Sequence, residues 1–185
     1  MDKIKTLKRG QVLVSAGEYG PVWRITEGMF RLERVGHDGL SLVQLGLPGD
    51  LLGVEALCAE PYAYTITAVT TGQAKLVDAG HELSRFGIVA KAYLQQQRRT
   101  HDMMKLRSGP VNERLAHFLK LLAHKADGSE YELDRRDLPV LKEVASILDV
   151  ATETVCRELN AFLPARVYPR AKREAWADDS FAMAA

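Results

Sequence analysis

The sequence predicts an α+β protein in which an antiparallel β-sandwich or barrel is followed by a long helix and then by a small helical domain. Three observations carry this prediction: short β-like runs broken by glycine over the first 80 residues, an uninterrupted helical stretch after Gly80, and two short amphipathic helices between Leu141 and Phe162. We therefore divide the chain into a β domain of residues 1–80, a connecting helix of residues 81–108 and a helical domain of residues 109–185.

The β prediction rests on apolar–polar alternation that stops at turn signals. Phe30–Glu33 alternates, His37–Gly39 contains an Asp-Gly pair typical of a hairpin turn, and Leu40–Leu47 is the expected returning strand. Further strands are expected at Tyr64–Val69 and Gln73–Val77. Strands at a spacing of about 8–12 residues, separated by turn signals, are typical of an antiparallel sandwich or barrel.

A long amphipathic helix is predicted from His81 to Arg107, with a polar break in its apolar stripe at Gln95–Arg99. At about 27 residues it would be about 40 Å long, too long to lie entirely on a domain of about 80 residues. We therefore expect part of it to pair with the same helix of a second subunit, as in a coiled coil. The alternative is a helix packed wholly on its own sheet. The residues expected at the dimer interface are Phe86, Val89, Tyr93 and Met103.

Two helices joined by a turn of about three to four residues are predicted between Leu141 and Phe162. Apolar residues form the inward faces, with Val150 in the turn and a buried face on the second helix that consists of Val155, Leu159 and Phe162. The outward face of the second helix then carries Thr152, Glu153, Cys156 and Arg157. Such a face is what a recognition helix presents to the major groove of DNA. The alternative is an ordinary helical hairpin with a weak surface ion pair between Glu153 and Arg157.

The outward side chains suit the reading of base edges. Arg157 can donate to O6 and N7 of guanine, and Glu153 can accept from the amino group of cytosine. Thr152 and Cys156 are short, so the helix can approach closely and either can touch a thymine methyl group. The net charge of +1 does not by itself indicate a nucleic-acid partner. A local basic cluster suits phosphate contact instead: Arg166, Arg170, Lys172 and Arg173.

Composition argues against several other classes of protein. No apolar run approaches the roughly 18 residues that span a bilayer, and no apolar signal core follows the first residues, so no membrane contact and a cytoplasmic location are expected. Cys58 and Cys156 lack metal-type spacing, so neither a disulfide nor an iron–sulfur cluster is expected. His37 is the only histidine before His81, which disfavours a cupin-type metal enzyme. We predict no catalytic residue, no metal and no cofactor.

Together these features resemble the cyclic-AMP receptor/fumarate-nitrate regulator (Crp/Fnr) superfamily of bacterial transcription factors. The resemblance rests on Pro48–Gly53 with Glu55–Leu57, on the long helix after Gly80, and on Val144–Arg157. It implies a cyclic-nucleotide-binding-like jelly roll (a β-roll sensor domain), a dimerisation helix and a C-terminal winged helix-turn-helix. It also implies a homodimer on double-stranded DNA that contacts RNA polymerase.

The resemblance further implies that Glu153 and Arg157 contact bases. Thr152 stands where the cyclic-AMP receptor has an arginine. We therefore expect a palindromic site with TTGAT-like half-sites, as in the fumarate-nitrate branch. Asp149 occupies a turn position that is often glycine, and Asp tolerates the left-handed backbone better than most residues.

The sensor region departs from the family pattern. Gly53 is followed by Val54, so Glu55 comes one place late, and residues 61–67 contain no Arg or Lys to hold a cyclic phosphate. We predict no response to cyclic AMP. Nothing basic lies beside Cys58, which favours a packed rather than a redox-reactive thiol. The degenerate effector pocket is expected to consist of Gly53, Glu55, Tyr62, Tyr64 and Thr65.

The sequence leaves open the signal, the target genes, and whether the protein activates or represses. It also leaves open whether the protein binds DNA constitutively. The alternative function is that of an effector-binding β-roll module that acts through protein–protein contacts.

Overall fold

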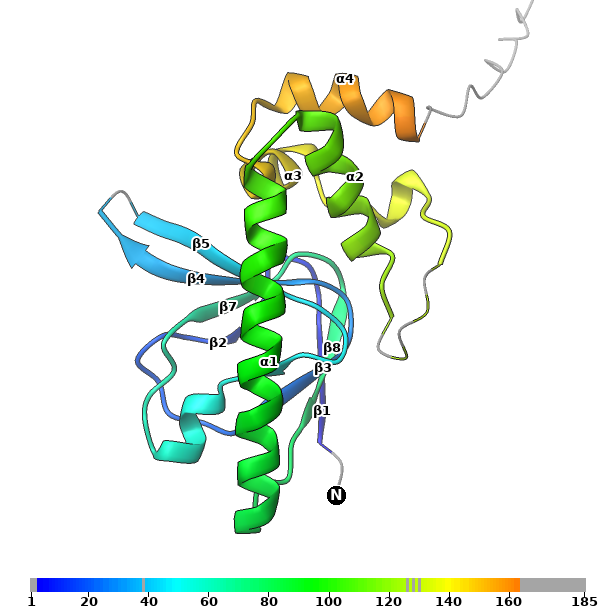
Figure 1. Ribbon diagram of the computed structural model, residues 1–185. Helices are drawn as coiled ribbons and strands as arrows, with labels where there is room; N and C mark the ends of the chain where they lie inside the picture. The colour runs from blue at the N-terminus through cyan, green and yellow to red at the C-terminus, as the bar shows by residue number, and fades with distance from the viewer. Residues whose placement is uncertain (1–2, 38, 126, 128, 130, 164–185) are drawn as a thin grey trace, which may run out of the picture.

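The computed structural model describes residues 3–37, 39–125, 127, 129 and 131–163. In this part of the chain, two antiparallel four-stranded sheets pack against each other to form a β-roll (Figure 1). The first sheet has the order β1 (Ile4–Leu7), β8 (Gly72–Leu76), β3 (Trp23–Glu27), β6 (Leu51–Leu52). The second has the order β2 (Val12–Val14), β7 (Thr65–Ala68), β4 (Phe30–Gly36), β5 (Gly39–Gly46).

The roll forms because alternate residues of both sheets point inward and bury an apolar core. Trp23, Ile25, Phe30, Leu32 and Ile66 belong to this core. The predicted hairpin is confirmed: β4 and β5 pair antiparallel from Phe30 with Gly46 to Gly36 with Gly39. A short 3-10 helix, η1 (Val54–Cys58), then leads toward β7.

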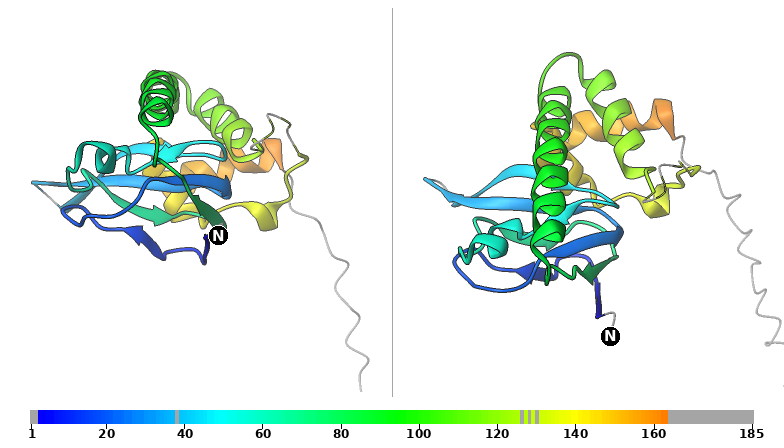
Figure 2. Two further views of the ribbon diagram at one scale, coloured as in Figure 1. Left: turned by 90° about the horizontal axis from the view of Figure 1, so that it is seen from below. Right: turned by 60° about the horizontal axis from the view of Figure 1, so that its bottom comes forward.

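Helix α1 (Glu82–Arg107) is straight and long, and it lies over one face of the roll, where it contacts β5, β6 and η1 (Figure 2). Helix α2 (Val111–Leu122) follows the turn at Gly109 and Pro110. After η2 (Arg135–Asp137) come α3 (Leu141–Leu148) and α4 (Thr152–Phe162). The predicted α+β architecture of a β-roll followed by helices is therefore confirmed. The wing of the predicted winged helix-turn-helix falls on residues 164–185, outside the described residues.

The β-roll and the last helices share one apolar core. Leu45 and Leu47 of the roll belong to the same buried cluster as Phe118 of α2 and Ile147 of α3. An ion pair between Arg31 on β4 and Glu143 on α3 crosses the same boundary. The helical domain is thus docked on the roll rather than tethered by α1 alone.

Candidate functional site

Helix α4 buries one face and exposes the other. Val155 and Leu159 are buried in the cluster shared with α3. Glu153, Cys156 and Arg157 are exposed, and Thr152 is half-buried. The structure thus places all four residues predicted to read bases away from the core, with three of them open to solvent. Phe162 was expected on the buried face, but it is 41% exposed because it lies in the last turn of the helix.

Arg157 extends into solvent with its side chain 75% exposed. Its Nε lies 3.2 Å from Oε1 of Glu158, the next residue along the helix. The four-residue spacing also allows an ion pair between Arg157 and Glu153, but the structure shows Arg157 paired with Glu158 instead. An exposed pair of this kind holds the guanidinium weakly, so Arg157 can leave it for a ligand at little cost.

The turn between α3 and α4 is fixed by its backbone. Asp149 adopts the left-handed conformation, with φ of 54°. The next amide, of Val150, donates to the carbonyl of Ala145 at 3.1 Å. Nη2 of Arg114 on α2 also lies 3.4 Å from the carbonyl oxygen of Asp149. These contacts set the angle at which α4 leaves α3, as a helix-turn-helix requires.

The residues predicted to contact phosphates lie outside the described residues: Arg166, Arg170, Lys172 and Arg173.

The roll holds a pocket of about 330 Å³ between the β6–η1 segment and α1. Four of the five residues predicted for the effector pocket line it, namely Gly53, Glu55, Tyr62 and Tyr64. Thr65 is not among the lining residues, and its hydroxyl instead accepts a hydrogen bond from the Ala16 amide at 3.2 Å. Sequence reasoning missed the wall that α1 contributes: Val89, Ala92, Gln95 and Gln96.

The chemistry of this effector pocket is apolar, with one carboxylate. Among the residues that the structure describes, its lining includes no Lys, Arg or His, and Glu55 is its one charged side chain; Gln44, Gln95 and Gln96 add amide groups. Glu55 is already engaged, because its Oε1 accepts from the Ala63 amide at 3.2 Å. Tyr62 is buried against Gly53 and donates to the Pro21 carbonyl at 2.7 Å. Burial, together with the nearby charges of Glu55 and Glu18, raises the pKa of Tyr62, so its hydroxyl stays neutral.

Cys58 also lines this pocket, at the end of η1. The expectation of a packed cysteine was wrong, because the thiol is free and exposed. The 3-10 helix ends there, and the chain turns outward through the left-handed residue Ala59.

A row of exposed side chains runs along α1. Leu83 is 89% exposed, Phe86 76% and Met104 63%. The row follows the alternating three- and four-residue steps of a coiled-coil interface: Leu83, Phe86, Ala90, Tyr93, Gln97, Thr100, Met104. It faces away from Ile88, Gln95 and Leu106, which α1 buries against its own chain.

Three of the four residues predicted for the dimer helix remain exposed: Phe86, Val89 and Tyr93. Met103 does not, because it packs against the core shared by roll and helices. Its neighbour Met104 occupies the exposed position instead. The two methionines are adjacent, and sequence periodicity alone assigned the wrong one to the surface.

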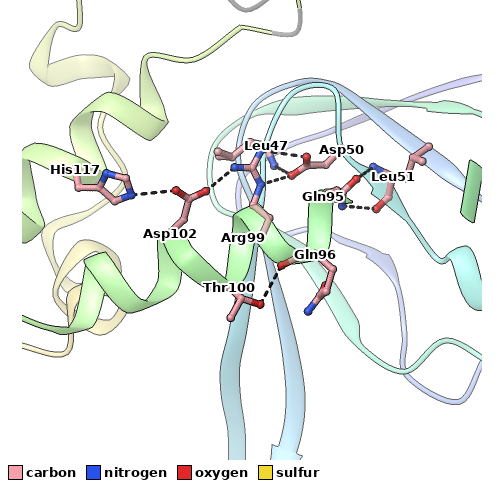
Figure 3. Close-up of polar contacts among 9 residues, drawn as sticks. All are labelled: Leu47, Asp50, Leu51, Gln95, Gln96, Arg99, Thr100, Asp102 and His117. Carbon is pink, nitrogen blue, oxygen red and sulfur yellow. Dashed lines mark hydrogen bonds and ion pairs between the residues drawn. The ribbon is translucent and has the colours of Figure 1, made fainter. Parts of the chain in front are cut away.

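A polar network ties α1 to the roll on one side and to α2 on the other (Figure 3). Gln95 donates to the Leu51 carbonyl and accepts from the Leu51 amide, at 3.0 and 2.7 Å. One turn further, Arg99 binds both oxygens of Asp50 and one oxygen of Asp102. The second oxygen of Asp102 lies 3.1 Å from Nε2 of His117 on α2. Contacts from the edge of the effector pocket therefore reach the helical domain through consecutive side chains.

Two classes of site find no support in the described residues. None of their helices combines the length and the apolar character that a membrane span requires. No cluster of three or more His, Cys, Asp or Glu side chains is placed to hold a metal ion within that same part of the chain.

Comparisons with known proteins agree with this geometry. Residues 4–84 match the family model of the cyclic nucleotide-binding domain. A transcriptional regulator of the CRP family from Thermus thermophilus is 26% identical, with a TM-score of 0.64, over 85% of this chain and 83% of that one. A comparison with curated proteins found no match.

Two further solved structures share the fold. A second transcriptional regulator from Thermus thermophilus, of the CRP/FNR family, is 22% identical, with a TM-score of 0.54, over 86% of this chain and 85% of that one. FixK2 from Bradyrhizobium japonicum is 18% identical, with a TM-score of 0.62, over 88% and 84%. Residues 4–84 therefore resemble a cyclic nucleotide-binding domain, within a chain that resembles the Crp/Fnr transcription regulators over most of its length.

Proposed function

We propose that this protein is a sequence-specific DNA-binding transcription regulator of the Crp/Fnr type, and not an enzyme. It binds as a homodimer to a palindromic site with TTGAT-like half-sites. The observation that carries the proposal is the outward face of α4, where Glu153, Cys156 and Arg157 are exposed on a helix whose opposite face is buried.

In this proposal α4 lies in the major groove. Arg157 donates to guanine, and Glu153 accepts from cytosine or orients Arg157. Cys156 and Thr152 allow close approach. Arg166, Arg170, Lys172 and Arg173 contact phosphates and add the salt-dependent part of the affinity. RNA polymerase is the further partner, and the cytoplasm is the proposed location.

The dimer forms through α1. The row from Leu83 to Met104 leaves large apolar side chains in water on a single chain, and a second α1 in parallel orientation would cover them. Gln97 and Thr100 interrupt the row with polar groups, which fix the register of such a pair. A two-fold dimer presents two copies of α4 to the two half-sites of a palindrome.

The effector pocket supports insensitivity to cyclic AMP. A cyclic phosphate is bound best by a cationic partner, and the described lining offers a carboxylate, tyrosines, glutamines and aliphatic side chains but no Lys, Arg or His. Cyclic AMP should therefore leave the melting temperature and the DNA affinity unchanged. A rise in melting temperature with cyclic AMP concentration would contradict this part of the proposal.

The second candidate is an effector-binding roll that acts through protein–protein contacts. It is favoured by the same exposed row on α1, which would then meet a different protein. DNA affinity separates the two candidates, because only the regulator needs α4 to read bases.

The test is fluorescence anisotropy with a duplex that carries two inverted TTGAT half-sites, measured at several salt concentrations. Arg157→Ala should weaken binding about tenfold or more, as expected for loss of a bidentate contact with guanine, and leave binding to unrelated duplexes nearly unchanged. Arg24→Ala, at an exposed arginine of the roll, is the matched control and should bind like the parent protein. Equal affinity of the Arg157→Ala variant and the parent would overturn the assignment of α4.

A further inference from the structure

A second and larger cavity, of about 980 Å³, lies between the β-roll and the helical domain. We call it the interdomain cleft. Among the described residues, its walls share none with the effector pocket. We propose that the interdomain cleft binds an amphipathic anion, a small molecule with a carboxylate, sulfonate or phosphate group on an apolar body. The proposed regulatory function does not require this site, so the inference goes beyond it.

The wall on the roll side consists of turns at one end of the two sheets. Lys8 and Arg9 come from the turn between β1 and β2, and Gly28 and Met29 from the turn between β3 and β4. Thr71 comes from the turn between β7 and β8. These turns are held together by backbone hydrogen bonds: Gly10 donates to Ala68 at 2.8 Å, and Val69 donates to Met29 at 2.8 Å. This wall is therefore preformed.

The opposite wall comes from the helical domain. The last two residues of α2, Leu121 and Leu122, line it, and so does His124, two residues after the helix ends. Arg136 and Leu138 come from η2 and the segment that leads to α3. A molecule in the cleft touches both halves of the chain at once.

The floor of the cleft is apolar and buried. Met29, Leu47, Val69 and Leu122 are all buried members of the core that joins the roll to the helices. Leu138 packs against the same core. A cavity of this size and character suits a drug-sized molecule with an aromatic or aliphatic body.

The rim carries cations on both sides. Lys8 and Arg9 are exposed on the roll side, and neither forms an ion pair with another described residue. Lys125 and Arg136 face them from the helical side. Two cationic side chains without a carboxylate partner, at the mouth of an apolar cavity, favour a ligand with an anionic head group.

Of the three acids on the rim, two are held by their own segments. Asp127 accepts from the amide and hydroxyl of Ser129, at 2.8 and 2.6 Å, and these bonds lower its pKa. Asp137 accepts from the Asp134 amide at 2.8 Å in the cap of η2. Glu27, the third acid of the rim, lies at the end of β3.

The probe for this site is 8-anilinonaphthalene-1-sulfonate, an aromatic sulfonate whose fluorescence rises in an apolar environment. Titration into the full chain should give saturable binding. The double variant Lys8→Ala/Arg9→Ala should weaken that binding about tenfold, since it removes two charge-assisted contacts. Thr71→Trp, at an exposed position of the rim, should block entry and weaken it by a comparable factor.

The matched control is the double variant Arg24→Ala/Lys91→Ala, which removes two exposed cations elsewhere on the surface. Its binding should equal that of the parent, and melting temperatures should verify that every variant is folded. Unchanged binding in both cleft variants overturns the inference, and so does equal weakening in the control. The Arg157→Ala variant should bind the dye normally, so failure of the DNA proposal and failure of this one are told apart.

Discussion

Arg99 on α1 binds Asp50 of the roll through two parallel hydrogen bonds, Nε to Oδ2 at 2.7 Å and Nη2 to Oδ1 at 3.0 Å. Both side chains are nearly buried, with exposed fractions of 11% and 5%. Burial alone would lower the pKa of the Arg99 guanidinium, but the hydrogen bonds and charges of Asp50 and Asp102 raise it above its usual value. The planar fork of arginine matches a carboxylate in this geometry, and a lysine would not.

Replacement of Arg99 by alanine should therefore destabilise the protein strongly. The change leaves Asp50 and Asp102 partly buried without their cation, and loss of one member of a buried pair removes about 3 kcal/mol or more. Urea denaturation measures the free energy of unfolding. The neighbouring exposed Arg98 is the control: Arg98→Ala should change this free energy by less than about 0.5 kcal/mol. Similar losses of unfolding free energy in the two variants would mean that the Arg99–Asp50 contact stabilises the fold no more than an exposed arginine does.

His117 gives the stability a pH dependence. Burial lowers its pKa below the ordinary 6.5, although Asp102 opposes the shift. The unfolded chain then binds a proton on this imidazole more readily than the folded chain does, so stability rises with pH in the window just below about 6.5. The part due to His117 is lost as the pH falls through that window.

The variant His117→Gln tests this, because an amide can still donate to Asp102 but does not titrate. Free energies of unfolding at about pH 7.5 and about pH 5.5 should differ less in the variant than in the parent. Identical differences in the two proteins would remove His117 as the source of the pH dependence.

Phe86→Asp should convert the proposed dimer into a monomer. A charge within the apolar row would be buried against its own copy in the partner helix, which is unfavourable for both chains. Sedimentation velocity should report half the parent's mass at the same concentration. Lys91→Asp introduces the same charge at an exposed position of α1 outside the row, and this variant should remain dimeric. A dimeric Phe86→Asp variant would place the interface elsewhere.

Asp149 should tolerate glycine and reject valine. Its φ of 54° is in the left-handed region, where a β-branched residue is strained by about 1–2 kcal/mol and glycine is not. Chemical denaturation should show Asp149→Gly at or slightly above the parent's stability and Asp149→Val below it. The DNA affinity of the valine variant should also fall, because the turn sets the direction of α4. Equal stability of both variants would contradict this role of the turn.

Local patterns predicted much of the fold. The Asp-Gly hairpin, the long helix and the outward face of α4 follow from alternation, helical periodicity and turn chemistry within short windows. The same logic failed where two neighbours compete for one face, as with Met103 and Met104. It also failed for Arg157, because Glu153 and Glu158 are both within reach and only the rotamers decide between them.

The polar break at Gln95–Arg99 illustrates what sequence reasoning missed. The sequence marks this segment as an interruption of the apolar stripe. The structure shows that its polar side chains contact the roll: Gln95 binds the backbone of Leu51, and Arg99 binds Asp50. These partners are 44 and 49 residues away along the chain. No local sequence pattern predicts a contact at that separation. The same holds for the interdomain cleft, because its two walls come from segments that are brought together only when the helices pack on the roll.

The core that joins Leu45 and Leu47 to Phe118 and Ile147 also bears on how such a chain can change during evolution. Domains that touch only through a linker can be exchanged whole between relatives. Here each half presents apolar side chains shaped to the other, so a transplanted helical domain would leave voids or overlaps at the junction. A functional chimera would have to take both sides of this contact from the same parent. Joining two proteins at the end of α1, where the sequence places a domain boundary, would therefore disrupt the core.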